Sequence, residues 1–145
     1  MIGILLLAGG LLAVMAAKKA PTSDGGRDAI RALKNGDDVA LRKAADRFTA
    51  VGDVQTAAVL NLEASRMADN RQNKPVVSAP TLDPDNTGSP GIAELVARLA
   101  AMETRIMSLI GWATAFASEG MPKTAAMLQR RAMDVQSVTP GLVAR

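Results

Sequence analysis

The sequence predicts an all-α protein with one N-terminal transmembrane helix, followed by two similar αα-hairpins joined by a proline-rich linker, and with one long heptad-patterned helix. Three observations predict this fold class. The first seventeen residues carry no charge, apolar residues elsewhere recur at steps of three and four, and one hairpin-like stretch occurs twice. We divide the chain into a transmembrane anchor (1–20), a hairpin region with a short leading helix (21–71), an extended linker (72–91), a long heptad helix with a return helix (92–138) and a tail (139–145).

Residues 1–20 are predicted to be a single membrane-spanning anchor. A helix that is apolar around its whole circumference does not suit the surface of a soluble domain. About 20 helical residues span the roughly 30 Å hydrocarbon core of a bilayer. Lys18 and Lys19 follow the apolar run and can extend to the headgroups. Basic residues outnumber acidic ones between Lys18 and Lys34, so we expect the bulk of the chain on the cytoplasmic, or virion-internal, side.

Two other interpretations of this segment stay open. Val14-Met15-Ala16 is a passable cleavage site for a secretory signal, although no Lys or Arg precedes the apolar run. Gly9, Ala13 and Ala17 form a face of small residues that would let another helix pack closely, in a protein core instead of lipid. We expect the segment to be retained as an anchor.

The composition excludes several kinds of chemistry. The chain has no histidine, cysteine or tyrosine, which removes imidazole catalysis, thiol chemistry and the usual zinc sites. The net charge is only +3 and the aromatic residues are Phe48, Trp112 and Phe116, a pattern that does not favour a nucleic-acid partner. We therefore expect no enzyme activity and no cofactor, and we assign no catalytic, cofactor-binding or metal-binding residue.

Capping residues and glycines indicate where the shorter helices begin and end. Residues 21–26 are predicted to be a turn between lipid and water. Aspartates precede the second and third of these helices, and glycines follow the first and second, as is usual at helix termini. The expected boundaries are a short helix over 27–34 stopped by Asn35-Gly36, a second capped by Asp37 or Asp38 and ended by Gly52, a third capped by Asp53 and running to about Arg71, and a last one over 123–136 broken by Thr139-Pro140-Gly141.

The stretch 72–91 contains four prolines, so we expect an extended linker. A domain this small is not expected to hold such a run alone, and we expect partner subunits to hold it. The stretch Asp83-Pro-Asp-Asn-Thr-Gly-Ser-Pro-Gly-Ile-Ala-Glu94, which begins in the linker, is similar to an EF-hand calcium loop, although two prolines and the lack of an entering helix depart from that pattern. The resemblance implies side-chain ligands from Asp83, Asp85, Thr87 and Glu94 and a carbonyl ligand from Ser89.

Residues 92–118 are predicted to form one long helix with a coiled-coil seam. The seam consists of Ile92, Leu95, Leu99, Met102, Ile106, Leu109, Ala113 and Phe116. It predicts self-association through its first six residues, with Arg98 and Glu103 as an opposite-sign pair beside it. The alternative is that this helix packs onto its own domain, because Val96, Ile110 and Trp112 widen the apolar stripe.

An internal repeat aligns residues 41–64 with residues 109–132 without a gap. The nine identical pairs are Leu41/Leu109, Ala45/Ala113, Phe48/Phe116, Gly52/Gly120, Thr56/Thr124, Ala57/Ala125, Ala58/Ala126, Leu60/Leu128 and Ala64/Ala132. Glycine suits a left-handed turn and alanines let a returning helix pack closely, so each copy is predicted to be an αα-hairpin. The turn Gly52-Asp53-Val54, with Ala57 and Ala64, resembles that of a tetratricopeptide hairpin. Two copies do not make a solenoid, and we expect a pseudo-symmetric four-helix unit.

Together these features predict a non-enzymatic, membrane-anchored structural or assembly protein. Its partners would be the lipid bilayer and the neighbouring subunits of a large complex. A component of a membrane-containing virion and an accessory subunit of a membrane complex both fit this description. Two alternatives from other classes stay open: a membrane-active, holin-like lesion former, and a calcium-responsive adaptor.

Overall fold

A computed structural model describes residues 24–75 and 79–143, and within these ranges the chain is helical and contains no β-strand. The predicted all-α fold class is confirmed. A leading helix covers residues 24–35, and it is followed by α2 (Asp38–Ala50), α3 (Val54–Arg71), α4 (Pro90–Met102), α5 (Ile106–Ser118) and α6 (Pro122–Val143). None of the helices in the described part combines the length and the hydrophobicity needed to cross a bilayer. The predicted anchor and its small-residue face lie outside the described residues.

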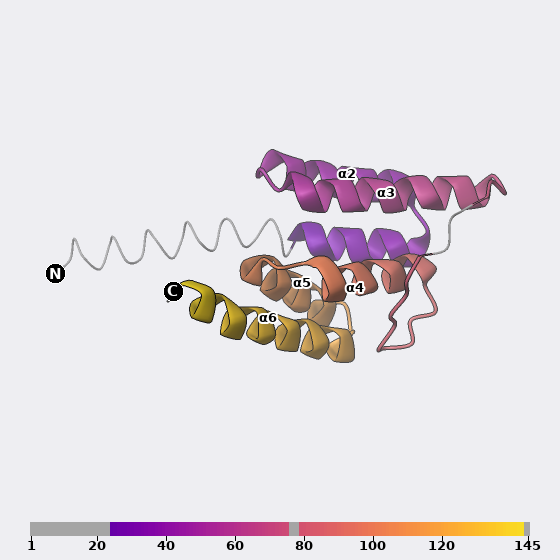
Figure 1. Cartoon of the computed structure of the whole chain (residues 1–145). Helices are drawn as coiled ribbons and strands as arrows, with labels where there is room; N and C mark the ends of the chain where they lie inside the picture. The colour runs from indigo at the N-terminus through magenta and orange to yellow at the C-terminus, as the bar shows by residue number, and fades with distance from the viewer. Residues whose placement is uncertain (1–23, 76–78, 144–145) are drawn as a thin grey trace, which may run out of the picture.

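The leading helix lies between two helical hairpins. Figure 1 shows the α2–α3 hairpin on one side of it and α4, α5 and α6 on the other. Its first turn comes very close to both sides, since a Cβ added at Gly25 would lie 3.0 Å from the Phe48 ring and one added at Gly26 would lie 3.0 Å from the Cβ of Ala115. The predicted turn over residues 21–26 is wrong for residues 24–26, which belong to the helix, and residues 21–23 lie outside the described part. At the two glycines the lack of a side chain permits the close packing.

The predicted internal repeat corresponds to two hairpins with the same turn. Gly52 and Gly120 both have positive φ, +86° and +79°, and each turn carries the paired hydrogen bonds of a Schellman motif. These bonds run from Gly52 N–H to Thr49 C=O (3.0 Å), Asp53 N–H to Phe48 C=O (2.8 Å), Gly120 N–H to Ala117 C=O (3.2 Å) and Met121 N–H to Phe116 C=O (2.9 Å).

Burial explains most of the identities between the two copies. Seven of the nine identical pairs are buried in both hairpins, and the exceptions are the two glycines and the exposed pair Ala58/Ala126.

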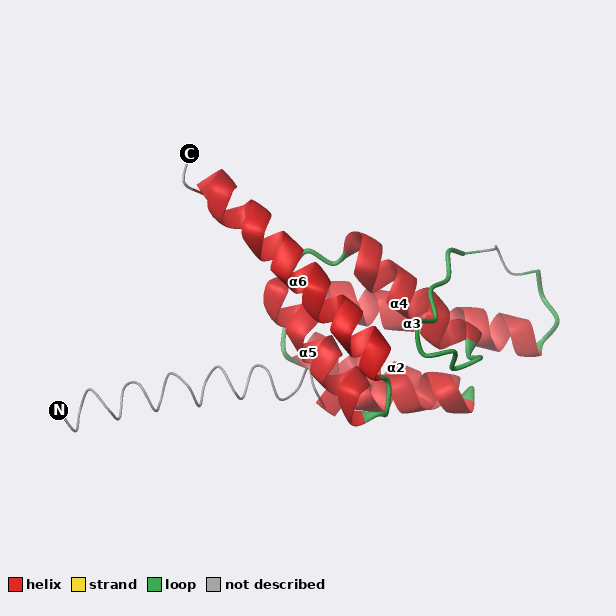
Figure 2. Ribbon diagram, turned by 90° about the horizontal axis from the view of Figure 1, so that it is seen from below, coloured by secondary structure: helices red, strands yellow, loops and turns green. Residues whose placement is uncertain are grey.

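The predicted four-helix unit leaves out two helices of the core. The leading helix precedes the first hairpin and α4 precedes the second, and both pack into the same core as the hairpins. In Figure 2 the α5–α6 hairpin lies in front of the α2–α3 hairpin.

The prediction of one long helix over 92–118 is wrong, because the chain is extended at residues 103–105. Glu103 has φ −75° and ψ 123°, and Arg105 has φ −88° and ψ 114°. The Glu103 carboxylate accepts hydrogen bonds from both the backbone N–H and the side chain of Arg105. Residues two apart do not face each other on a helix, so this pairing requires extended backbone.

The break divides the predicted coiled-coil seam between two helices. Ile92, Leu95, Leu99 and Leu109 are buried in the chain's own core, whereas Met102 is 66% exposed. The alternative prediction, packing onto the chain's own domain, is confirmed for these four side chains. They are out of reach of a second copy while the fold is intact, so we do not propose self-association through this seam.

The structure differs from two further predictions: that this small domain does not hold the linker by itself, and that the last helix breaks at residues 139–141. The fold itself holds the described end of the linker, because Leu82 N–H donates to Ala93 C=O (2.9 Å) and Ser89 Oγ donates to Leu33 C=O (3.3 Å). Helix α6 continues to Val143 instead of breaking at residues 139–141. A proline inside a helix removes one hydrogen bond and can be absorbed by a bend, and the preceding turns are already held against α5.

Candidate functional site

The acidic residues of the calcium-like loop point to different partners. Asp83 accepts hydrogen bonds from the backbone N–H groups of Thr87 (2.9 Å) and Gly88 (3.0 Å). Glu94 lies on α4, where both of its oxygens accept from the Arg66 guanidinium of α3 at 2.9 Å. In the described part of the chain, no three acidic side chains are placed to hold a metal ion. The EF-hand-like arrangement is therefore wrong.

Asp85 caps a helix that has no capping side chain of its own. In the first hairpin, Asp53 accepts a hydrogen bond from the backbone N–H of Thr56 at 3.1 Å. The equivalent residue of the second hairpin is Met121, whose side chain has no acceptor oxygen. Asp85 supplies the missing carboxylate from the linker and accepts from two backbone N–H groups of the first turn of α6, at 3.1 and 2.7 Å. A residue predicted as a calcium ligand thus stabilises a helix N-terminus.

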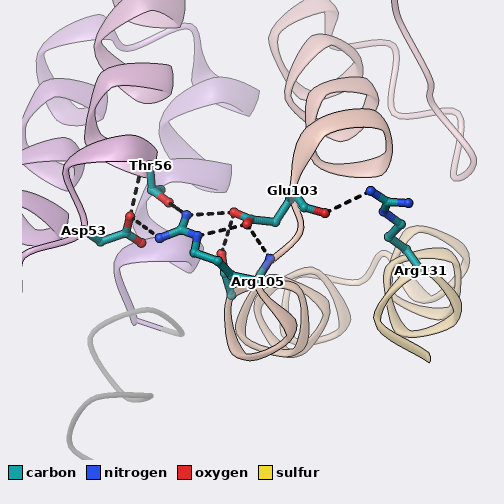
Figure 3. Close-up of polar contacts among 6 residues, drawn as sticks. Asp53, Thr56, Glu103, Arg105 and Arg131 are labelled. Carbon is teal, nitrogen blue, oxygen red and sulfur yellow. Dashed lines mark hydrogen bonds and ion pairs between the residues drawn. The ribbon is translucent and has the colours of Figure 1, made fainter. Parts of the chain in front are cut away.

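Arg105 joins the two halves of the fold at a charged junction (Figure 3). Its Nη1 lies 2.7 Å from Asp53 Oδ1, and its Nη2 donates to Thr56 Oγ1 at 3.0 Å. Its Nε and Nη2 donate to the two oxygens of Glu103, at 2.9 and 2.8 Å. From α6, Arg131 donates to the Glu103 carbonyl at 3.2 Å. Each guanidinium nitrogen of Arg105 therefore has a partner within the fold, and the bonds to Asp53 and Thr56 join the two hairpins.

The environment keeps Glu103 ionised although its side chain is only 5% exposed. Burial acts to raise the pKa of this carboxyl. The hydrogen bonds from the Arg105 side chain and backbone and from the Ser108 hydroxyl outweigh burial and hold the pKa below its ordinary value. Buried charges that are paired and hydrogen-bonded in this way are tolerated inside a protein. We assign the junction a structural role.

A second acidic cluster lies between α3 and α4. Glu63 is 1% exposed, and burial together with a hydrogen bond to Glu94 raises the pKa of Glu63 to about 8. Burial also acts to raise the pKa of Glu94, but the hydrogen bonds from Glu63 and Arg66 outweigh it and lower that pKa. Arg98 Nε, 3.3 Å from Glu63, acts in the opposite direction to burial. We conclude that Glu63 carries the proton that the two carboxylates share.

We expect the free energy of unfolding to fall as the pH rises from about 4.5 to about 8. In this range folded Glu63 keeps a proton that the unfolded chain releases, so the folded state binds more protons and loses stability with rising pH. The chain has no histidine to titrate in the same range. Urea unfolding at several pH values measures the effect. Glu63→Gln should remove the dependence, and a slope that persists in this variant would assign it to another group.

An apolar pocket of about 260 Å³ lies between α3 and α4. Arg98 and the charged junction contribute polar atoms to its wall. Its apolar lining residues are Ala58, Val59, Leu95, Leu99, Met102 and Trp112.

Trp112 is the central aromatic residue of the core. Phe48 stacks on it with ring centroids 5.8 Å apart and planes at 14°, and Phe116 lies 5.9 Å away at 35°. These two phenylalanines are equivalent in the repeat, so one indole bridges both hairpins. Trp112 is 0% exposed, and its Nε1 has no hydrogen-bond acceptor among the described residues.

Sequence reasoning did not single out Glu63 or the pocket. Glu63 lies three residues after Leu60 and directly before Ala64, on the buried face of α3. A carboxylate on an apolar helical face is the signal that could have identified it. The pocket had no comparable signal, because it depends on how α3 and α4 pack.

Comparisons with known proteins found no match to a family model, to a curated protein or to a solved structure. The fold and the sites define the class: a protein that is helical throughout its described elements and built on a repeated hairpin, with an apolar pocket beside a charged junction.

Proposed function

We propose that this chain is a non-enzymatic assembly protein, anchored in a membrane by residues 1–20, that binds a neighbouring subunit through an exposed apolar face of α3. We define the α3 face as Val54, Ala58 and Leu62, together with Met102 of α4. A membrane-containing virion or a membrane complex with small accessory subunits would provide such a setting.

The observation that carries the proposal is the exposure of this face. Val54 is 65% exposed and Leu62 is 44% exposed, and Ala58 between them is also exposed. The three follow one another every four residues, so they form one stripe on the helix. Met102, which is 66% exposed, lines the same pocket as Ala58. A row of apolar side chains in water is typical of a surface that a protein partner covers.

The polar residues support a binding role over a catalytic one. The charged junction and the Glu63/Glu94 cluster use their carboxylates and guanidinium groups for contacts between helices. A general acid or base needs access to a substrate, and Glu63 and Glu103 are both buried. The exposed α3 face offers contact area to a partner without moving any of these groups.

Site-specific photo-crosslinking in the native host tests the proposal. A photoreactive residue at Leu62 is expected to give a discrete adduct with one partner protein, because the α3 face is covered in the assembly. The matched control is Val39 of α2, which is 60% exposed and lies outside this face. Equal labelling at both positions, or no adduct at Leu62, would contradict the proposal. Release of the chain from membranes by alkaline carbonate would contradict the anchor.

A further inference from the structure

We infer that the pocket between α3 and α4 binds one apolar side chain of the partner protein, and that Trp112 donates a hydrogen bond from its indole N–H to the adjoining backbone carbonyl of that partner. The inference rests on the proposed function, because it specifies what the partner presents next to the α3 face.

The size of the pocket selects the class of ligand. Pockets for cofactors and drug-sized molecules have volumes of about 300–1,000 Å³. At about 260 Å³ this pocket is just below that range, and it suits one bulky side chain. Its wall is mainly apolar, with Val59, Leu95 and Leu99 among the lining residues. An aliphatic or aromatic residue of a partner matches this lining, and removing its apolar surface from water favours binding.

The indole N–H provides the polar recognition. A buried donor without an acceptor destabilises the fold, and Trp112 Nε1 has no acceptor among the described residues. The Cε3 and Cζ3 atoms of the indole lie next to Gly26, 3.4 Å from where its Cβ would be. These two carbons belong to the six-membered ring, whereas the N–H belongs to the five-membered ring of a side chain that lines the pocket. A partner carbonyl that enters with its apolar side chain would satisfy this donor.

The pocket can adjust to admit the carbonyl. Trp112 is fully buried, so the side chains around it must move for the bond to form. Met102 lines the pocket with Trp112 and is 66% exposed. Methionine is unbranched and flexible, and it is frequent at binding surfaces for this reason.

A fragment titration of the full chain tests the inference without the partner. The chain has one tryptophan, so a proton–nitrogen correlation spectrum contains one indole signal. The probe is N-acetyl-leucine methylamide, which carries an apolar side chain beside backbone carbonyls. We expect a saturable shift of the indole signal with a dissociation constant of about 1 mM, the weak end of the affinity scale. N-acetyl-glycine methylamide, which has the carbonyls alone, should cause no saturable shift.

The repeat provides a matched pair of variants. Ala58→Phe fills the mouth of the pocket and should weaken probe binding at least about tenfold. Ala126→Phe places the same ring at the equivalent exposed position of α6, outside the pocket, and should leave binding unchanged. An indole signal that does not move, that moves equally with both probes, or that is insensitive to Ala58→Phe would overturn the inference. A positive crosslink at Leu62 in that case would leave the proposed function standing.

Discussion

Replacing Arg105 by methionine is expected to lower the free energy of unfolding by about 2 kcal/mol, which is less than the cost of breaking a fully buried ion pair because the Arg105 side chain is itself 38% exposed. The variant leaves Glu103, 5% exposed, without its counter-charge, and Asp53, 15% exposed, loses the same partner. The Ser108 hydroxyl and the backbone N–H of residue 105 still donate to Glu103, which limits the loss. Urea unfolding of the full chain, followed by circular dichroism, measures it.

Arg47→Met is the matched control for this prediction. Arg47 pairs with Asp28 at 2.7 Å, but their side chains are 58% and 41% exposed. Exposed pairs contribute about 0–1 kcal/mol, so this variant should change stability little. If both variants lose the same stability, the junction at Arg105 does not hold the helices together as the geometry indicates.

Phe48→Ala is expected to destabilise the fold by about 3–5 kcal/mol, the usual range for removing a buried phenylalanine ring. Phe48 is 1% exposed, stacks on Trp112 and touches the leading helix at Gly25. The substitution therefore opens a cavity where the leading helix and both hairpins meet. Tryptophan fluorescence can follow the unfolding, because Trp112 is the single tryptophan.

Phe116→Ala should cost a similar amount, since Phe116 is equivalent in the repeat and 0% exposed. Val39→Ala, on the same helix as Phe48 but 60% exposed, should stay within about 0.5 kcal/mol of the unsubstituted chain. A loss for Phe48→Ala no larger than that of Val39→Ala would show that the aromatic contact does not stabilise the core.

Several boundaries followed from residues close together in the sequence. Asp37 caps α2 and Asp53 caps α3, and positive φ at Gly36 and Gly52 marks two helix ends, as the sequence indicated. Such signals are readable because the interacting groups lie within four residues of each other. The repeat was readable for a related reason, since its identities mark the side chains that each hairpin buries.

The break between α4 and α5 was not readable in this way. Apolar residues continue at steps of three and four through residues 103–105, because α4 and α5 each need one buried face. The spacing of the apolar residues therefore does not reveal that the chain leaves the helical conformation at residues 103–105. The interactions that stabilise the break join Arg105 to Asp53 and Thr56, about fifty residues away in the sequence.

The sequence by itself determined the all-α fold class, most helix ends and the duplicated hairpin. Caps, glycine turns and periodic burial act over a few residues, so they can be recognised from local sequence. The close packing of Gly25 and Gly26, the capping of α6 by Asp85, the protonated state of Glu63 and the pocket beside Trp112 depend on the packed structure. Each of them arises where segments distant in sequence meet. In that setting, burial and nearby charge decide what a residue does, and residue type and spacing do not reveal it.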